Sequence, residues 1–133
     1  LHMCASMGCE IPVWDSRDRF GDTNLLVRSM EMGYDLADVL GSKQVALMRG
    51  HGCVVVAETL RSAIYTAVYL EINADIQIKS HMLAGKGITF LSQGEITQIN
   101  DSRTEFTVER AWERWTKRAN RNYIPEPHRH NFP

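Results

Sequence analysis

Residues 45–57 read VALMRGHGCVVVA, two apolar runs separated by a glycine-containing link. Each run has the length of a β-strand, and the second is rich in β-branched residues, which favour strands. The link Gly50-His51-Gly52 is short enough for a hairpin turn, so the two strands are expected to pair with each other. Neither run alternates cleanly between apolar and polar residues, which predicts central strands of a sheet. This pattern places His51 at or near a strand end.

His51 is the best candidate for a chemical role. Glycine on both sides removes side-chain bulk and permits unusual backbone angles, which is useful where a ligand or metal ion must approach the ring. A neutral imidazole is the commonest metal ligand among side chains, and a strand-end turn would hold it in place. The same glycines could serve only to make the turn, with His51 as a partly buried turn residue. Both interpretations stay open on the residues alone.

Helix and turn signals surround the two strands. N-cap residues precede the expected helices, one of them with a capping-box spacing, and glycine marks several of the helix ends. The expected elements are a short strand at 11–14, a charged loop at 15–22, a helix after Ser29, a long helix from Thr59 to about Ala84, a short helix from Ser92, and a last helix opened by Thr104 or Thr107.

The long helix carries an apolar stripe with a spacing of three and four, which predicts its buried face. The stripe consists of Leu60, Ala63, Ile64, Ala67, Val68, Ala74 and Ile78. Glu71 falls on this stripe, so its carboxylate must find a donor or stay near an opening. In the last helix, the side chains expected toward the core are Phe106, Trp112 and Trp115.

Composition limits the class of protein. The 133 residues suit one domain, with 44% apolar and 23% charged residues, which excludes a disordered or low-complexity chain. A net charge of -1 does not favour binding to nucleic acid or to an anionic membrane. No apolar run approaches the roughly 20 residues that cross a bilayer. Three cysteines without CxxC spacing favour a reducing compartment, so we expect a cytoplasmic protein.

Other groups of charged residues could bind a ligand or could simply be solvated at the surface. His128 and His130 could share a metal ion on a strand, but they lie in a proline-containing stretch where a solvated tail is favoured. Arg110, Arg114 and Lys117 share one helical face and could bind a phosphate, a carboxylate or a neighbouring subunit, or remain solvated. The acidic residues of the charged loop lack the spacing of an EF-hand calcium site; they are Asp15, Asp18 and Asp22.

The segment 45–57, followed by Leu60-Arg61-Ser62-Ala63 and Tyr69-Leu70-Glu71-Ile72-Asn73-Ala74, resembles the class II aldolase/adducin superfamily. The upstream segments 11–13 and 33–41 fit the same family in order and spacing. The resemblance implies an α/β fold, an α/β/α sandwich around a mostly antiparallel sheet. It implies a partial domain, with residues 1–122 as its C-terminal part, followed by a proline-containing tail at 123–133.

The resemblance also implies a function. Members include sugar-phosphate aldolases, an epimerase, decarboxylases and the non-catalytic adducin head, and the segment 111–115 looks most like the decarboxylase branch. The implied activity is that of a metal-dependent carbon–carbon lyase, an aldolase or decarboxylase that acts on a small hydroxylated or carbonyl substrate through a metal-stabilised enolate. The alternatives are an adducin-like binding or assembly module without catalysis, and a fragment with no function of its own.

The family holds a divalent metal ion, zinc or manganese, with three histidines. His51 matches the third of these, the one on the turn, whereas no His-x-His pair precedes it in this sequence. The chain is therefore expected to lack the N-terminal part of the site. The resemblance further implies a homotetramer with sites between subunits, and Tyr123 or Arg121 is expected to bind the substrate of an adjacent subunit.

Overall fold

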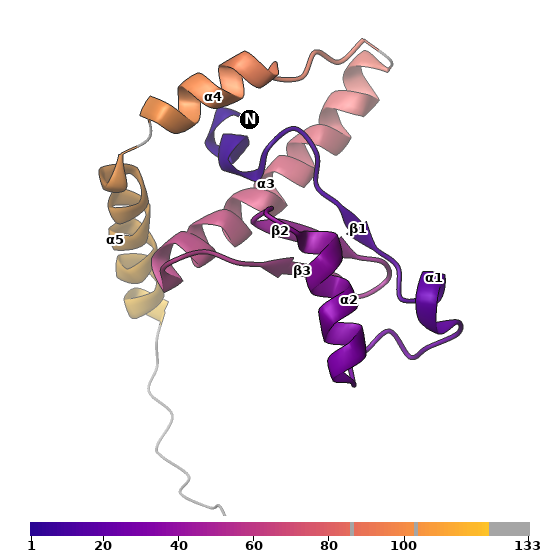
Figure 1. The fold of residues 1–133 in the computed structure, drawn as a ribbon. Helices are drawn as coiled ribbons and strands as arrows, with labels where there is room; N and C mark the ends of the chain where they lie inside the picture. Colours follow the sequence, from indigo (N-terminus) through magenta and orange to yellow (C-terminus); the bar gives the residue numbers. More distant parts are fainter. Residues whose placement is uncertain (86, 103, 123–133) are drawn as a thin grey trace, which may run out of the picture.

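The computed structural model describes residues 1–85, 87–102 and 104–122 (Figure 1). The fold is α/β, as predicted, with a small sheet and mostly helices. In chain order the elements are the 3-10 helix η1 (His2–Met7), β1 (Val13–Trp14), α1 (Arg17–Phe20), α2 (Met30–Leu40), β2 (Val45–Met48), β3 (Gly52–Val55), α3 (Leu60–Ala84), α4 (Gln93–Ser102) and α5 (Glu105–Asn122).

The sheet in the described residues has three strands in the order β1-β2-β3. β2 and β3 pair antiparallel, with Val45 opposite Val55, which confirms the predicted hairpin. β1 pairs parallel with β2, with Val13 beside Leu47, so this sheet is mixed. β2 is central, as predicted, whereas β3 lies at an edge of the described sheet and its prediction as a central strand is wrong.

Local capping signals correctly located the helix starts. The Ser29 hydroxyl accepts a hydrogen bond from the Met32 N–H at 3.2 Å, and Thr59 caps α3 in the same way at 3.1 Å. Ser92 and Glu95 form the predicted capping box, because each side chain accepts a bond from the other residue's backbone N–H. These bonds satisfy N–H groups that the first turn of a helix otherwise leaves unpaired.

β2 contributes to two core clusters. Val45 is buried against Leu70 of α3 and against residues of η1. Met48, three residues later, packs instead with Trp14 of β1 and Met32 of α2. Because successive side chains of a strand point to opposite faces, α2 packs on one face of β2 and α3 with η1 on the other.

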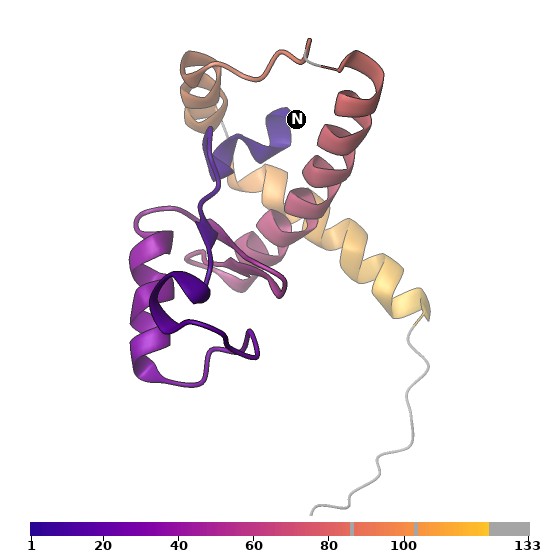
Figure 2. The same ribbon diagram turned by 90° about the vertical axis from the view of Figure 1, so that its right-hand side faces the viewer.

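The predicted buried face of α3 is wrong. Leu60 and Ile78, at the two ends of the predicted stripe, are 70% and 61% exposed, whereas the buried side chains of α3 are Tyr65, Thr66 and Leu70. The reason is tertiary, since only the N-terminal half of α3 runs beside the sheet and its other half extends past it (Figures 1 and 2). Glu71, which the stripe prediction placed near the core, is exposed.

α5 packs against α3 through aromatic rings. The ring of Trp115 lies 6.1 Å from that of Tyr65 and 6.2 Å from that of Tyr69, so its predicted inward position is confirmed. Trp112 is half-buried beneath the Arg61 guanidinium, which lies 5.6 Å from the ring. Phe106 is 70% exposed, so its predicted place in the core is wrong.

Two further findings concern helices. The stretch 15–22, predicted as a loop, contains the single helical turn α1 before Gly21. In the described parts of the chain, no helix combines the length and apolar character needed to cross a membrane.

Candidate functional site

The turn between β2 and β3 presents His51 at the surface. Its backbone N–H donates a hydrogen bond to the Met48 carbonyl at 3.0 Å, which closes the turn. Gly50 has φ +68° and Gly52 has φ +152°, conformations that side-chain-bearing residues rarely adopt. The His51 residue is exposed, so the prediction of a turn at a strand end is confirmed and the partly buried alternative is not.

Arg49 connects this turn to the end of β1. Its backbone N–H donates to the Trp14 carbonyl at 2.9 Å, and its Nε lies 2.6 Å from Oδ2 of Asp15. Asp15 also pairs with Arg17, whose Nη2 lies 3.0 Å from the same oxygen. Hydrogen bonds from Arg17, and then the Arg49 guanidinium beside it, hold the pKa of the Asp15 carboxyl well below its ordinary value. The carboxylate therefore stays ionised beside the turn.

A loop from residues 22–28 packs against the same turn. Leu25 has a positive φ of +65°, which is unfavourable for a side chain of its size, and the Leu25 N–H donates to the Thr23 hydroxyl at 3.1 Å. Its Cδ1 lies 3.1 Å from the position that a Cβ on Gly50 would occupy. A side chain at position 50 is thus disfavoured by the backbone angle and by the close contact with Leu25.

The described residues do not make up a complete metal site. Within residues 1–85, 87–102 and 104–122, no three His, Cys, Asp or Glu side chains gather where they could hold a metal ion. His51 can offer one imidazole nitrogen, which by itself does not fit a site of three or four ligands. His128 and His130, the weaker metal candidates, lie outside the described residues.

The two predicted substrate-binding residues are not brought to His51 within the described chain. Tyr123 lies outside the described residues, and Arg121 is exposed in the last turn of α5. In Figure 1 the C-terminal end of α5 and the β2–β3 turn lie on opposite sides of the molecule. The predicted basic face is present on α5 as a shallow surface depression lined by Arg110, Glu113, Arg114, Lys117, Arg118 and Arg121.

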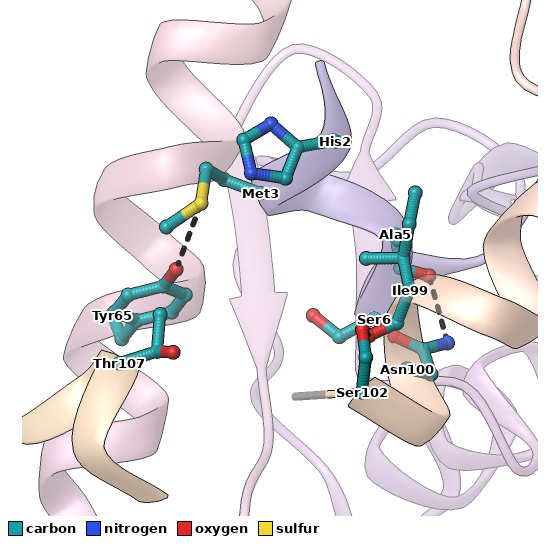
Figure 3. Close-up of a pocket in the computed structure, with 9 residues that line it drawn as sticks. All are labelled: His2, Met3, Ala5, Ser6, Tyr65, Ile99, Asn100, Ser102 and Thr107. Atoms are coloured by element: carbon teal, nitrogen blue, oxygen red, sulfur yellow. Dashed lines mark hydrogen bonds between the residues drawn. The ribbon is translucent and has the colours of Figure 1, made fainter. Parts of the chain in front are cut away.

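A second hollow, which the sequence did not predict, lies among η1, α3, α4 and the start of α5 (Figure 3). Its volume is about 130 Å³, smaller than the pockets that usually hold metabolites. The Tyr65 hydroxyl contacts the Met3 sulfur at 3.7 Å, and Asn100 donates to the Ala5 carbonyl at 3.3 Å. The Ser6 hydroxyl is buried there without a hydrogen-bond partner among the described residues. The hollow suits a few water molecules better than a substrate.

Sequence reasoning missed the pair formed by Asp15 and Arg49. The sequence alone indicates Asp15 only as one acid of a charged loop and gives Arg49 no role of its own. A usable signal existed, because parallel pairing of β1 with β2 sets Trp14 beside Met48 and therefore Asp15 next to Arg49. That signal requires the strand partners to be known, which the local sequence does not provide.

Comparison with known proteins gives one family and two relatives. A sequence profile described as "Class II Aldolase and Adducin N-terminal domain" matches residues 1–78. The chain is 28% identical over 137 aligned positions to "Decarboxylase tropJ" of Talaromyces stipitatus, covering 88% of this chain and 51% of that protein. It is 24% identical over 88 positions to the "3,4-dihydroxyphthalate decarboxylase" of Arthrobacter keyseri, covering 66% and 35%.

The matches cover only part of each relative. The chain spans about half the length of the first relative and about a third of the second. The matched profile ends at residue 78 and describes an N-terminal domain. It therefore does not support the prediction that residues 1–122 form the C-terminal part of the family's domain.

Proposed function

Because the chain belongs to the class II aldolase and adducin family, as its sequence predicted, we propose that it is part of a carbon–carbon lyase that releases CO2 from a small hydroxylated acid. The observation that carries this proposal is that both relatives are named as decarboxylases, one of them for a dihydroxylated aromatic acid. A decarboxylase is therefore favoured over an aldolase or an epimerase. We also propose that the complete domain has the family's α/β/α sandwich, since helices pack on both faces of β2.

His51 is the proposed metal-binding residue of this chain. Its exposed ring stands on a turn fixed to two strands, which suits a ligand that must keep one position. The expected ion is zinc, with manganese as the alternative. The described residues do not complete such a site, and we expect its other donors in the N-terminal part of the family's site and not at His128 and His130.

Arg121 and Tyr123 are the proposed substrate-binding residues, acting on a neighbouring copy. A guanidinium pairs well with the carboxylate of an acid substrate. The end of α5 points away from the β2–β3 turn of its own chain, which favours a site shared between subunits of a homotetramer (Figure 1). The free thiols of Cys4, Cys9 and Cys53 fit a reducing compartment, so we propose a cytoplasmic protein.

The test uses the full-length protein, its bound metals and its CO2 release from hydroxylated aromatic acids, 3,4-dihydroxyphthalate among them. We expect a bound divalent ion, loss of activity with a chelator, and at least a hundredfold lower kcat/KM in His51→Ala. His81→Ala, which removes another exposed histidine at the end of α3, is the matched control and should keep its activity. Activity that ignores both the chelator and His51→Ala would end the proposal.

An adducin-like binding module is the second candidate. It is favoured by the finding that no three metal-ligating side chains gather within the described residues. This function predicts that His51→Ala leaves assembly with a partner protein intact and that no CO2 is released from any acid of the panel. Loss of partner binding in His51→Ala would count against it.

A further inference from the structure

We infer that Asp15 is a positioning residue for His51, because its ion pair with Arg49 fixes the turn that presents the imidazole. The inference rests on the proposed role of His51 and adds a residue that neither the family match nor the relatives assign. Asp15 lies 36 positions before His51 in the sequence, so its effect on the turn is a tertiary one.

The carboxylate of Asp15 is itself held in one orientation. Oδ1 accepts a hydrogen bond from the Arg17 backbone N–H at 3.0 Å, and Oδ2 faces the Arg17 guanidinium at 3.0 Å. The side chain of Asp15 is only 16% exposed, which reduces the competition from water. An oriented and mostly buried carboxylate gives Arg49 a fixed partner rather than one of many surface contacts.

Arg49 is attached to the end of β1 at two points. Its main chain bonds to the Trp14 carbonyl, and its side chain pairs with the next residue, Asp15, at 2.6 Å. The buried Arg49 Nε has no hydrogen-bond partner among the described residues, so its attraction to Asp15 is that of an ion pair, and main chain and side chain together restrict the residue. Arg49 is the first residue of the turn, so the path of the chain into Gly50 and His51 is fixed as well.

Leu25 restricts the turn from a second direction. Its side chain lies against Gly50, and its own backbone holds an unfavourable positive φ. Such a conformation persists only where the surrounding contacts compensate for it. The loop and the ion pair thus contact successive residues of the turn, Gly50 and Arg49, directly before His51.

The exposed ring of His51 explains why this support is needed. A side chain in solvent has no packing of its own to hold it, whereas a ligand must lie within about 0.5 Å of its working position. A fixed backbone at the turn narrows the range of positions that the ring can reach. Asp15 acts through Arg49, since it contributes to the site only by holding the residue two positions before the imidazole.

The first test measures hydrogen exchange of the turn amides in the full chain. Asp15→Asn should speed exchange at Gly50, His51 and Gly52 about tenfold relative to the amides of β2, because the ion pair between Asp15 and Arg49 is lost. The matched control is Glu109→Gln, which also removes a carboxylate paired with an arginine, Arg61, but lies on α5 and not at the turn. Equal acceleration in both variants, or none in Asp15→Asn, would overturn the inference.

The second test follows the His51 ring by NMR during titration with Co²⁺ alone. We expect Asp15→Asn to raise the apparent Kd at this ring at least threefold, Arg49→Lys to raise it less, and Glu109→Gln to leave it unchanged. An unchanged Kd in Asp15→Asn would overturn the positioning role. If the wild-type ring does not respond to Co²⁺ at all, the proposed metal role of His51 fails, and the exchange experiment still decides whether Asp15 fixes the turn.

Discussion

The turn end of the sheet and the outer half of α3 differ in how their side chains are held. At the turn end, Trp14 is 2% exposed, and the charged residues beside it are paired. In the outer half of α3, Met82 and Leu83 are 81% and 90% exposed. The hairpin and the end of α3 were both predicted from local signals, yet the first has far more tertiary support within the described residues.

This difference shows where the chain is rigid. The turn end combines strand pairing, a buried tryptophan, an ion pair and a packed loop around a single exposed histidine. The outer half of α3 relies mainly on its own helical hydrogen bonds and on few contacts with the rest of the described chain. Regions with few buried apolar contacts open at a lower free-energy cost than regions that form the core. A residue that must hold a ligand is better placed at the turn end.

The largest contrast is expected between two tryptophans. Trp14→Ala should lower the free energy of unfolding by about 3–5 kcal/mol, because it removes a buried ring from the cluster with Met32 and Met48. Trp112→Ala on α5 should cost only about 1–2 kcal/mol, since that ring is half-buried and mainly contacts Arg61. Urea unfolding monitored by circular dichroism measures both values.

The control for Trp14→Ala is Trp14→Phe, which keeps an aromatic ring but loses the 2.7 Å hydrogen bond from Nε1 to Asp35. Trp14→Phe should lower the free energy of unfolding by less than half of the amount by which Trp14→Ala lowers it. Equal losses for Trp14→Ala and Trp112→Ala would show that the two regions are equally supported and would contradict the comparison.

Two glycines should respond in opposite directions. Gly50→Ala should destabilise by about 1–2 kcal/mol, because φ is +68° and the new Cβ would lie 3.1 Å from Leu25. Gly33→Ala should stabilise by about 0.5–1 kcal/mol, since that glycine lies within α2 with open space around its Cβ position. Thermal unfolding of the two variants tests this pair, and the same sign for both would contradict the structure.

The turn and the helix caps could be predicted because they are local. A glycine-containing link between two apolar runs, or Ser92 followed by Glu95, determines its structure within a few residues. The buried face of α3 could not be predicted in this way, because Tyr65 is buried by η1 and α5, which come from the two ends of the chain. The pair of Asp15 and Arg49 was missed for the same reason, since it depends on a parallel strand pairing.

The ionised carboxylates of the turn end should make it sensitive to acid. Arg17 and Arg49 lower the pKa of Asp15, and hydrogen bonds from Trp14 and then Arg19 lower that of Asp35. A group with a lowered pKa in the folded state contributes stability above its unfolded pKa, about 3.9 for Asp, and this contribution is lost as the pH falls further.

Urea midpoints measured between pH 7 and pH 3 test this dependence. Stability should decline below about pH 4, and the decline should be smaller in Asp15→Asn and in Asp35→Asn, which cannot release or bind a proton at those positions. If one of these variants loses as much stability in acid as the wild type, the carboxylate that it replaces does not cause the acid sensitivity.

The smallest effect is expected at the outer end of α3. Met82→Ser and Leu83→Ser should each change the free energy of unfolding by no more than about 0.5 kcal/mol, because neither side chain is packed in the described chain. Leu70→Ala, on the buried half of the same helix, is the matched comparison and should cost about 2–4 kcal/mol. A loss above about 1.5 kcal/mol in either serine variant would mean that these apolar side chains are covered in solution. The contrast between the rigid turn end and the unsupported helix half would then not hold for the protein as it exists in solution.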